Sequence, residues 1–428
     1  MNLQILKLLG IIMNSRITSP PLKAMRELRK RGIKRMPEVF DEDSSSKIKS
    51  LKFLREWLAG EMLTRHNGQW VLNSFLPPFP GRAYDRMFDN LLSGRRLSPV
   101  SAYLAVTSRC PFNCPHCSIK GRRQGELSKE CWLETISQLH ELGNSVIGFT
   151  GGEPLMREDL PELVHAATEG GAETIVFSSG AGFTPELAAK LKAAVLWAFC
   201  VSIESFEKEQ NSKMRNSPEA LQIAVDALKL SVKTGFYTMT GSVARRSFVE
   251  NREFEKVYSK ARELGVHEVR IVEPMPCGKL IDADKEDFLT KEHIKILRDF
   301  HVNTNRKGKL PKVCAFNHIE SPEYFGCGGG TQHMFIDYNG EVCPCDFTPL
   351  SFGCIENQSL KEIWDRMNEA MHNPRRNCFI QKNHEIIRKH FHEHGTLPLP
   401  PELSEKVCEE AGTEEFSDYF AMVTGRKK

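Results

Sequence analysis

Three cysteines in one short loop constrain this chain more than any other feature of its sequence. They are Cys110, Cys114 and Cys117, in a stretch that reads Cys-Pro-Phe-Asn-Cys-Pro-His-Cys. Thiolates at this spacing can hold three corners of a cubane iron–sulfur cluster, which leaves the fourth iron without a protein ligand. Zinc is the alternative, but a closed zinc site needs four ligands, so His116 or a distant residue would have to complete it.

A second motif follows after an expected helix and an apolar run, at residues 128–142 and 146–149. It consists of Gly151, Gly152, Glu153 and Pro154. The two glycines allow the backbone to approach a ligand closely, and the proline fixes the turn. The carboxylate is expected to brace this loop rather than to meet solvent.

Together, the Cys-x3-Cys-x2-Cys loop and the Gly-Gly-Glu-Pro loop resemble the radical S-adenosylmethionine (SAM) superfamily. The resemblance implies that the three cysteines hold a [4Fe–4S] cluster whose open iron binds SAM, with the Gly-Gly-Glu-Pro loop beside it. It also implies that SAM is cleaved to a 5′-deoxyadenosyl radical, which abstracts hydrogen from a substrate. An electron donor such as flavodoxin or ferredoxin would supply the electron that reduces the cluster.

Strand-like runs alternate with helical stretches from about residue 99. The expected strands are Ser101–Thr107, Val146–Thr150, Thr174–Ser178, Leu196–Ile203, Tyr237–Val243 and Glu268–Val272, and the helices between them include Glu158–Glu169, Pro185–Lys192, Pro218–Thr234 and Glu253–Leu264. Six βα repeats predict a parallel sheet in the α/β class, with ligands at the C-terminal strand ends. This agrees with the partial (β/α)6 TIM-like barrel of radical SAM enzymes.

The resemblance nominates further cofactor-binding residues at these strand ends. Ser179 follows the third strand, where family members often contact the ribose. Ser202 and Glu204 resemble a Ser-x-Asp pair near SAM, with Glu in place of the usual Asp, and Arg215 would contact a carboxylate or the ribose. Each of these residues also fits an ordinary hydrogen bond at a turn or a strand end.

Cysteines concentrate a second time beyond the barrel, at Cys314, Cys327, Cys343, Cys345, Cys354 and Cys378. Residues 334–342 predict a β-hairpin with an Asn-Gly turn, which would bring the flanking cysteines together. This region resembles the SPASM or twitch domain, which carries auxiliary iron–sulfur clusters.

A complete SPASM domain also carries a Cys-x2-Cys-x5-Cys-x3-Cys run, which is absent here, and Gln381 stands where its second cysteine would fall. One auxiliary [4Fe–4S] cluster is therefore expected. Cys327 and Cys345 are its best candidate ligands, Cys354 and Cys378 the leading candidates for the others, and Cys343 and Cys314 remain open. A hairpin stapled by zinc is the alternative, because closed four-cysteine sites also suit zinc.

The predicted domains are a helical N-terminal extension (1–98), a radical SAM core (99–312), a small SPASM/twitch-like domain (313–385) and a C-terminal tail (386–428). An apolar run over 3–13 is interrupted by Lys7 and falls short of the roughly 20 residues that span a bilayer. A basic stretch from Lys23 to Arg35 follows. This segment predicts either a helix packed on the body or peripheral contact with a membrane.

Charge and cysteine use limit the remaining classes. The chain has 58 basic and 55 acidic residues, so its net charge does not indicate binding to nucleic acid. Its 13 cysteines are grouped in a way that is not typical of a secreted protein held together by disulfides. This grouping predicts reduced thiols and a cytoplasmic protein. We expect an enzyme that acts on a peptide or a lipid. An RNA-modifying enzyme and a non-catalytic zinc or iron–sulfur protein are the alternatives.

Overall fold

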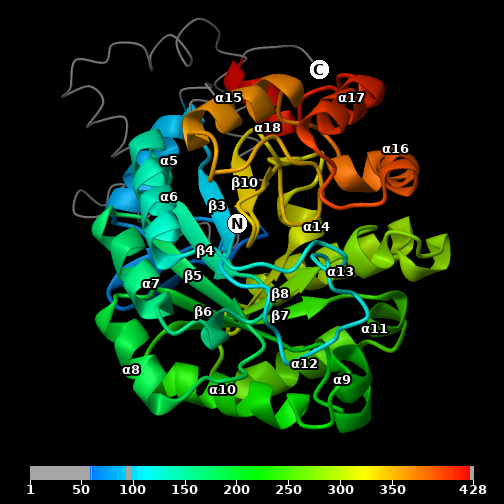
Figure 1. Ribbon diagram of the computed structural model, residues 1–428. Coiled ribbons are helices and arrows are strands. Elements are labelled where there is room, and N and C mark those ends of the chain that lie inside the picture. Colours follow the sequence, from blue (N-terminus) through cyan, green and yellow to red (C-terminus); the bar gives the residue numbers. More distant parts are fainter. Residues whose placement is uncertain (1–57, 59, 93–97, 425–428) are drawn as a thin grey trace, which may run out of the picture.

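A nine-stranded sheet dominates the computed structural model, which describes residues 58, 60–92 and 98–424 (Figure 1). Its strands are β3 (Ser101–Ala105), β4 (Val146–Thr150), β5 (Glu173–Ser178), β6 (Ala198–Ser202), β7 (Tyr237–Val243), β8 (Glu268–Val272), β9 (Lys312–Ala315), β10 (His333–Ile336) and β11 (Val342–Cys343). Strands β3 to β9 follow one another in chain order, β10 pairs in parallel with β3, and β11 pairs antiparallel with β10. This mostly parallel sheet is a partial TIM-like barrel.

Helices cover the outside of the sheet (Figure 1). Those between the core strands are α6 (Lys129–Leu142), α7 (Leu160–Glu169), α8 (Pro185–Ala193), α9 (Lys208–Arg215), α10 (Ala220–Thr234), α11 (Arg246–Glu250), α12 (Glu253–Glu263) and α13 (Lys291–Arg306). Local sequence sets their ends: the Ser128 side chain caps α6 by accepting from the Cys131 N–H, and Gly143 ends that helix with φ 88°. The strands and helices expected between residues 101 and 272 are all present.

The N-terminal strand ends are closed by the segment that precedes the barrel. It forms a hairpin of β1 (Thr64–His66) and β2 (Gln69–Val71), followed by α5 (Arg82–Leu92). Buried Lys312 donates to the carbonyls of Val71 and Leu72, at 2.8 and 3.1 Å. Buried Glu268 accepts from the Tyr237 hydroxyl at 2.9 Å. A ligand must therefore enter from the opposite, C-terminal end of the strands.

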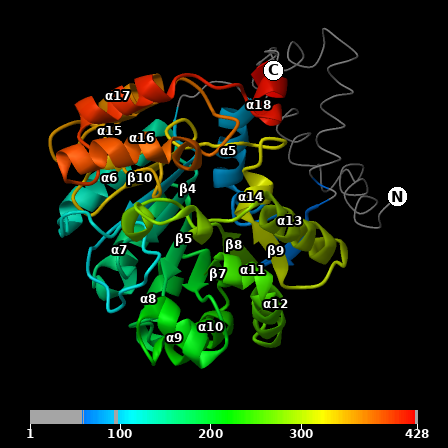
Figure 2. The same ribbon diagram turned by 90° about the vertical axis from the view of Figure 1, so that its right-hand side faces the viewer.

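The C-terminal region packs on the barrel instead of trailing from it. Its helices are α14 (Phe316–Ile319), α15 (Leu360–Ala370), α16 (Phe379–His394), α17 (Pro401–Ala411) and α18 (Asp418–Thr424). Helices α16 and α17 lie side by side above the barrel (Figure 2). They bury Ile387 and Val407, so residues expected to form a tail belong to the folded core.

Most of the expected N-terminal extension, including the apolar run and the basic stretch, lies outside the described residues. The part that is described contains a β-hairpin as well as a helix. Within the described chain, no helix combines the length and apolar character that crossing a membrane requires.

Candidate active site

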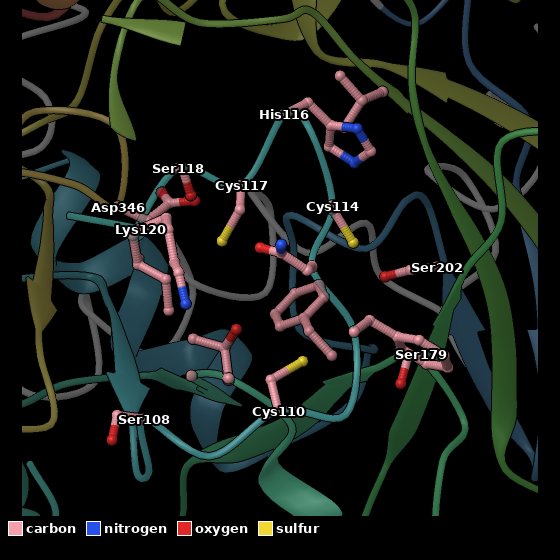
Figure 3. A pocket seen from close by; sticks show the side chains of 18 of the residues that line it. Ser108, Cys110, Cys114, His116, Cys117, Ser118, Lys120, Ser179, Ser202 and Asp346 are labelled. Carbon is pink, nitrogen blue, oxygen red and sulfur yellow. The ribbon is translucent and has the colours of Figure 1, made fainter. Parts of the chain in front are cut away.

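The first cysteine loop leaves the C-terminal end of β3 and borders a cavity of about 530 Å³ (Figure 3). Cys110, Cys114 and Cys117 all line this cavity. The Cys117 N–H donates to the Cys114 carbonyl at 3.4 Å, which turns the chain between these two residues. Burial raises the pKa of the Cys114 thiol, and the Arg215 cation opposes that shift. A bound metal would hold these side chains as thiolates.

The spacing of the sulfurs bears on which metal could bind. A tetrahedral zinc ion with Zn–S bonds of about 2.3 Å would hold its sulfurs about 3.8 Å apart. Among the described residues, no three cysteines bring their sulfurs within 4.8 Å of one another. A cubane cluster binds each thiolate at a separate iron, so it fits these wider separations better than zinc does.

The Gly-Gly-Glu-Pro loop is held against the cysteine loop by backbone hydrogen bonds. The Gly152 N–H donates to the Thr107 carbonyl and the Glu153 N–H to the Arg109 carbonyl, both at 2.7 Å. A Cβ at Gly152 would lie 2.2 Å from the Arg109 carbonyl oxygen, and Gly151 has φ 136°. The glycines are therefore needed for close approach between the two loops, and both also line the cavity.

Glu153 supports the site from behind. Its side chain is fully buried and accepts hydrogen bonds from the Ser178 hydroxyl and the Ser179 N–H, both at 2.7 Å, and also from the Ser179 hydroxyl. Neither Glu153 nor Pro154, which begins a short 3-10 helix, lines the cavity. The structure thus gives Glu153 a positioning role, through the serines at the end of β5.

The remaining predicted cofactor residues gather at the same end of the barrel. Ser179 and Ser202 line the cavity (Figure 3). Buried Arg215 pairs with buried Glu204 at 2.6 Å, and its other nitrogen lies 3.5 Å from the Cys114 sulfur. The His116 ring, held between two cluster cysteines, lies 3.6 Å from the same carboxylate. Desolvation lowers the pKa of His116 to about 3, so this ring is neutral.

Three cysteines of the second group border an inner cavity of about 280 Å³. Cys327, Cys345 and Cys378 all line it. The Cys378 thiol donates to Cys327, which lowers the pKa of Cys327. Ser202, His116 and Asp346 line both cavities, so the two cavities adjoin. The two cysteine groups thus face adjoining cavities.

The other candidate ligands of the second group lie elsewhere. The Cys354 thiol donates to the Asn339 carbonyl at 3.4 Å and does not line the inner cavity. Buried Cys343 lies 3.5 Å from an Arg122 nitrogen, and Cys314 is buried in β9. The structure brings Cys378, and not Cys354, together with Cys327 and Cys345.

Glu61, His301 and His318 are also close enough to hold a metal ion. The Nδ1 atom of His301, however, accepts a hydrogen bond from the Ala315 N–H at 3.1 Å. Its Nε2 atom must then carry the ring proton and lacks a lone pair for a metal. This buried group is consistent with a hydrogen-bonded cluster in the wall of the barrel.

Sequence reasoning missed two polar residues of the interior, Arg270 and Asp346, both of which line the inner cavity. A signal for Arg270 exists, because it stands in an otherwise apolar stretch of a buried strand. Asp346 directly follows Cys345 in a loop, and the sequence does not indicate that its side chain lines the cavity.

Comparisons with known proteins agree with this geometry. Residues 104–261 match the model of the radical SAM superfamily, and residues 327–389 match the SPASM model, described as an iron–sulfur cluster-binding domain. The fold and the cysteine sites define a cluster-binding enzyme that uses SAM. The chain is a radical SAM enzyme with a C-terminal SPASM domain, and its cofactors are SAM, a [4Fe–4S] cluster and an auxiliary cluster.

Several relatives are named AdoMet-dependent heme synthase. The protein of Methanosarcina barkeri is 26% identical over 291 residues, which cover 61% of this chain and 80% of the relative. That of Nitratidesulfovibrio vulgaris is 25% identical over 295 residues, covering 62% and 79%. These alignments extend over most of each relative.

Solved structures share the fold at low identity. Streptococcus suis SuiB bound to S-adenosylmethionine has a TM-score of 0.53 at 14% identity, covering 65% of this chain and 69% of SuiB. The enzyme anSMEcpe with bound AdoMet has a TM-score of 0.51 at 18% identity, covering 63% and 82%.

Proposed function

We propose that Cys110, Cys114 and Cys117 hold the cluster that binds SAM. The observation that carries this proposal is that all three thiols open onto one cavity with the glycine loop and the strand-end serines. When bound, the cluster supplies the electron that cleaves SAM to a 5′-deoxyadenosyl radical, which removes a hydrogen atom from the substrate.

The protein's own residues would position SAM. Gly151 and Gly152 expose backbone to the cavity, while Ser179 and Ser202 present hydroxyl groups. The Glu204–Arg215 pair stands behind them, beside Cys114. These groups offer hydrogen bonds to a ligand with amino, carboxylate and ribose groups, which is the chemistry of SAM.

We assign the auxiliary cluster to Cys327, Cys345 and Cys378. They come from separate loops but line one cavity, and this shared cavity supports the assignment. A substrate between the two cysteine groups would lie within reach of both sites. Reduced flavodoxin or ferredoxin remains the proposed electron donor, and a cytoplasmic location remains a prediction.

For the substrate we propose a tetrapyrrole that bears carboxylate side chains. This proposal is supported by the relatives named heme synthase, whose alignments extend over most of their length. The aromatic side chains of Phe177 and Phe347, which line both cavities, suit a flat apolar ring. A peptide is the second candidate, and it is suggested by the resemblance to SPASM-containing enzymes. The lipid candidate depends on the N-terminal segment outside the described residues.

One experiment tests the reaction and the substrate class together. Anaerobically reconstituted protein with SAM and dithionite should form 5′-deoxyadenosine, and a true substrate should increase the rate. Haem-type porphyrins with free carboxylates, short peptides and lipid vesicles are added in parallel. Stimulation by peptides but not by porphyrins would overturn the tetrapyrrole proposal, and absence of deoxyadenosine formation would overturn the reaction itself.

A further inference from the structure

A buried cation stands in the inner wall of the barrel, where side chains along β8 alternate between the two faces of the sheet. Val269 and Ile271 pack into the core under the helices. Arg270 lies between them in sequence, so its side chain points into the barrel. It is 3% exposed and lines the inner cavity.

Aromatic rings surround the Arg270 guanidinium. Its central carbon lies 5.1 Å from the ring centres of Phe75 and Phe177 and 5.3 Å from that of Phe316. Cation–π contacts of this kind stabilise the positive charge of the guanidinium. They supply no hydrogen-bond acceptors for its N–H edges.

Those edges are only partly satisfied. The Tyr103 side chain shares a hydrogen bond with the guanidinium. The Nη1 atom of Arg270 is buried and has no hydrogen-bond partner among the described residues. Glu320 and Asp346 line the same cavity and interact electrostatically with Arg270, but neither forms a contact ion pair with it. A buried charge without a contact ion pair is costly, and a buried unpaired donor adds to that cost.

A glycine in β4, the strand between those of Tyr103 and Phe177, makes room for these two side chains. A Cβ at Gly148, in β4, would lie 2.5 Å from the Tyr103 ring and 3.0 Å from the Phe177 ring. Any larger residue would displace the two side chains that contact the guanidinium. The glycine thus keeps the space in which Arg270 is held.

The position of Arg270 relates it to both cysteine groups. The cavity that it lines is also lined by Cys327, Cys345 and Cys378 of the auxiliary site and by Ser202 and His116, which border the SAM site as well. A substrate group bound to Arg270 would therefore lie in the cavity that residues of both sites line.

We propose that Arg270 binds a carboxylate group of the substrate through its free Nη1 edge. A planar guanidinium matches a carboxylate in shape and charge, and the desolvated surroundings strengthen the bond. This inference rests on the proposed function and names the side chain that binds a carboxylate of its substrate. In a tetrapyrrole, the bound group would be a propionate.

The test compares an anionic and a neutral form of one ligand in protein carrying its clusters. Haem and haem dimethyl ester are titrated into the wild type, Arg270→Gln and Arg262→Gln, a control at an exposed arginine of α12, and binding is followed by the Soret absorbance. The wild type and the control should prefer haem to its ester, and Arg270→Gln should bind haem about 10- to 100-fold more weakly, as expected for one charged hydrogen bond. Its affinity for the ester should not change.

Other outcomes separate the two proposals. Equal binding of haem to the wild type and to Arg270→Gln would overturn the role of Arg270. If neither porphyrin binds the wild type, the tetrapyrrole proposal fails, and thermal shift with benzoate against benzamide decides the role of Arg270. Stabilisation by benzoate alone, lost in Arg270→Gln, supports the carboxylate site, and its absence from the wild type overturns it. If Arg270→Gln does not fold, Arg270→Lys replaces it, because lysine keeps the charge but cannot bind with two parallel N–H groups.

Discussion

The two cysteine groups face adjoining cavities, yet they are built in different ways. Cys110, Cys114 and Cys117 lie in one loop at the end of β3, so their proximity follows from sequence spacing. Cys327, Cys345 and Cys378 come from three loops that meet only after β10 pairs with β3 and α16 packs above the barrel. One site is therefore local in the chain, and the other is a product of the fold.

The surroundings of the two groups differ as well. Arg215 places a cation beside Cys114, and its partner Glu204 balances that charge. The second group has the Asp346 and Glu320 carboxyls in its cavity, which Arg215 and Glu204 also line, and burial raises the pKa of Asp346 to about 6. Because Arg215 lies 3.5 Å from the Cys114 sulfur, substitutions at this ion pair should affect the first group more than the second.

The largest effect is expected at the local site. Replacement of Cys110, Cys114 or Cys117 by alanine should reduce formation of 5′-deoxyadenosine to background, because each thiolate holds a separate corner of the cluster. Cys131→Ala, in α6 and away from the cavity, should retain the wild-type rate. Wild-type turnover in any one of the three variants would contradict the assignment.

The second prediction concerns the site built by the fold. The double variant Cys327→Ala/Cys345→Ala should contain about four iron atoms per chain instead of about eight. The spectral change that SAM causes at the first cluster should remain. The iron and zinc contents per chain are measured in anaerobically purified protein. Unchanged iron content together with loss of zinc would show that these cysteines bind a structural zinc ion instead.

A finer comparison separates the two cysteines that the sequence ranked equally. Cys378→Ala should lose most of the auxiliary iron, because its thiol hydrogen-bonds to Cys327 inside the cavity. Cys354→Ala should keep that iron, because the Cys354 thiol contacts the Asn339 carbonyl instead. The reverse result would show that the loops rearrange when the cluster binds.

The sequence predicted what depends on local order. Helix α6 starts at a capping serine and ends at a glycine, and the six expected strands carry clear apolar patterns. The first cysteine loop and the glycine loop were recognisable because their residues are adjacent. The auxiliary hairpin was also expected, since an Asn-Gly turn separates its strands.

What the sequence could not supply depends on long-range packing. Nothing in residues 333–336 indicates that β10 joins the barrel sheet beside β3. The choice of Cys378 over Cys354 follows from the packing of α16, and the isolation of Arg270 follows from three phenylalanines in three separate segments. These contacts have no local signature.

The smallest predicted effect tests whether the two sites are electrostatically independent. Glu204→Gln removes the anion that balances Arg215 but leaves that cation 3.5 Å from the Cys114 sulfur. Added positive charge stabilises the reduced cluster, so the midpoint potential of the SAM-binding cluster should rise on the order of 60 mV, equivalent to a tenfold change in a one-electron equilibrium. The auxiliary potential should move less, because Arg215 contacts the Cys114 sulfur directly, whereas Glu204 only shares the inner cavity with Cys327, Cys345 and Cys378. Redox titration followed by electron paramagnetic resonance measures both, with Glu207→Gln as an exposed control at the start of α9. Equal shifts at both clusters would show that the sites share one field.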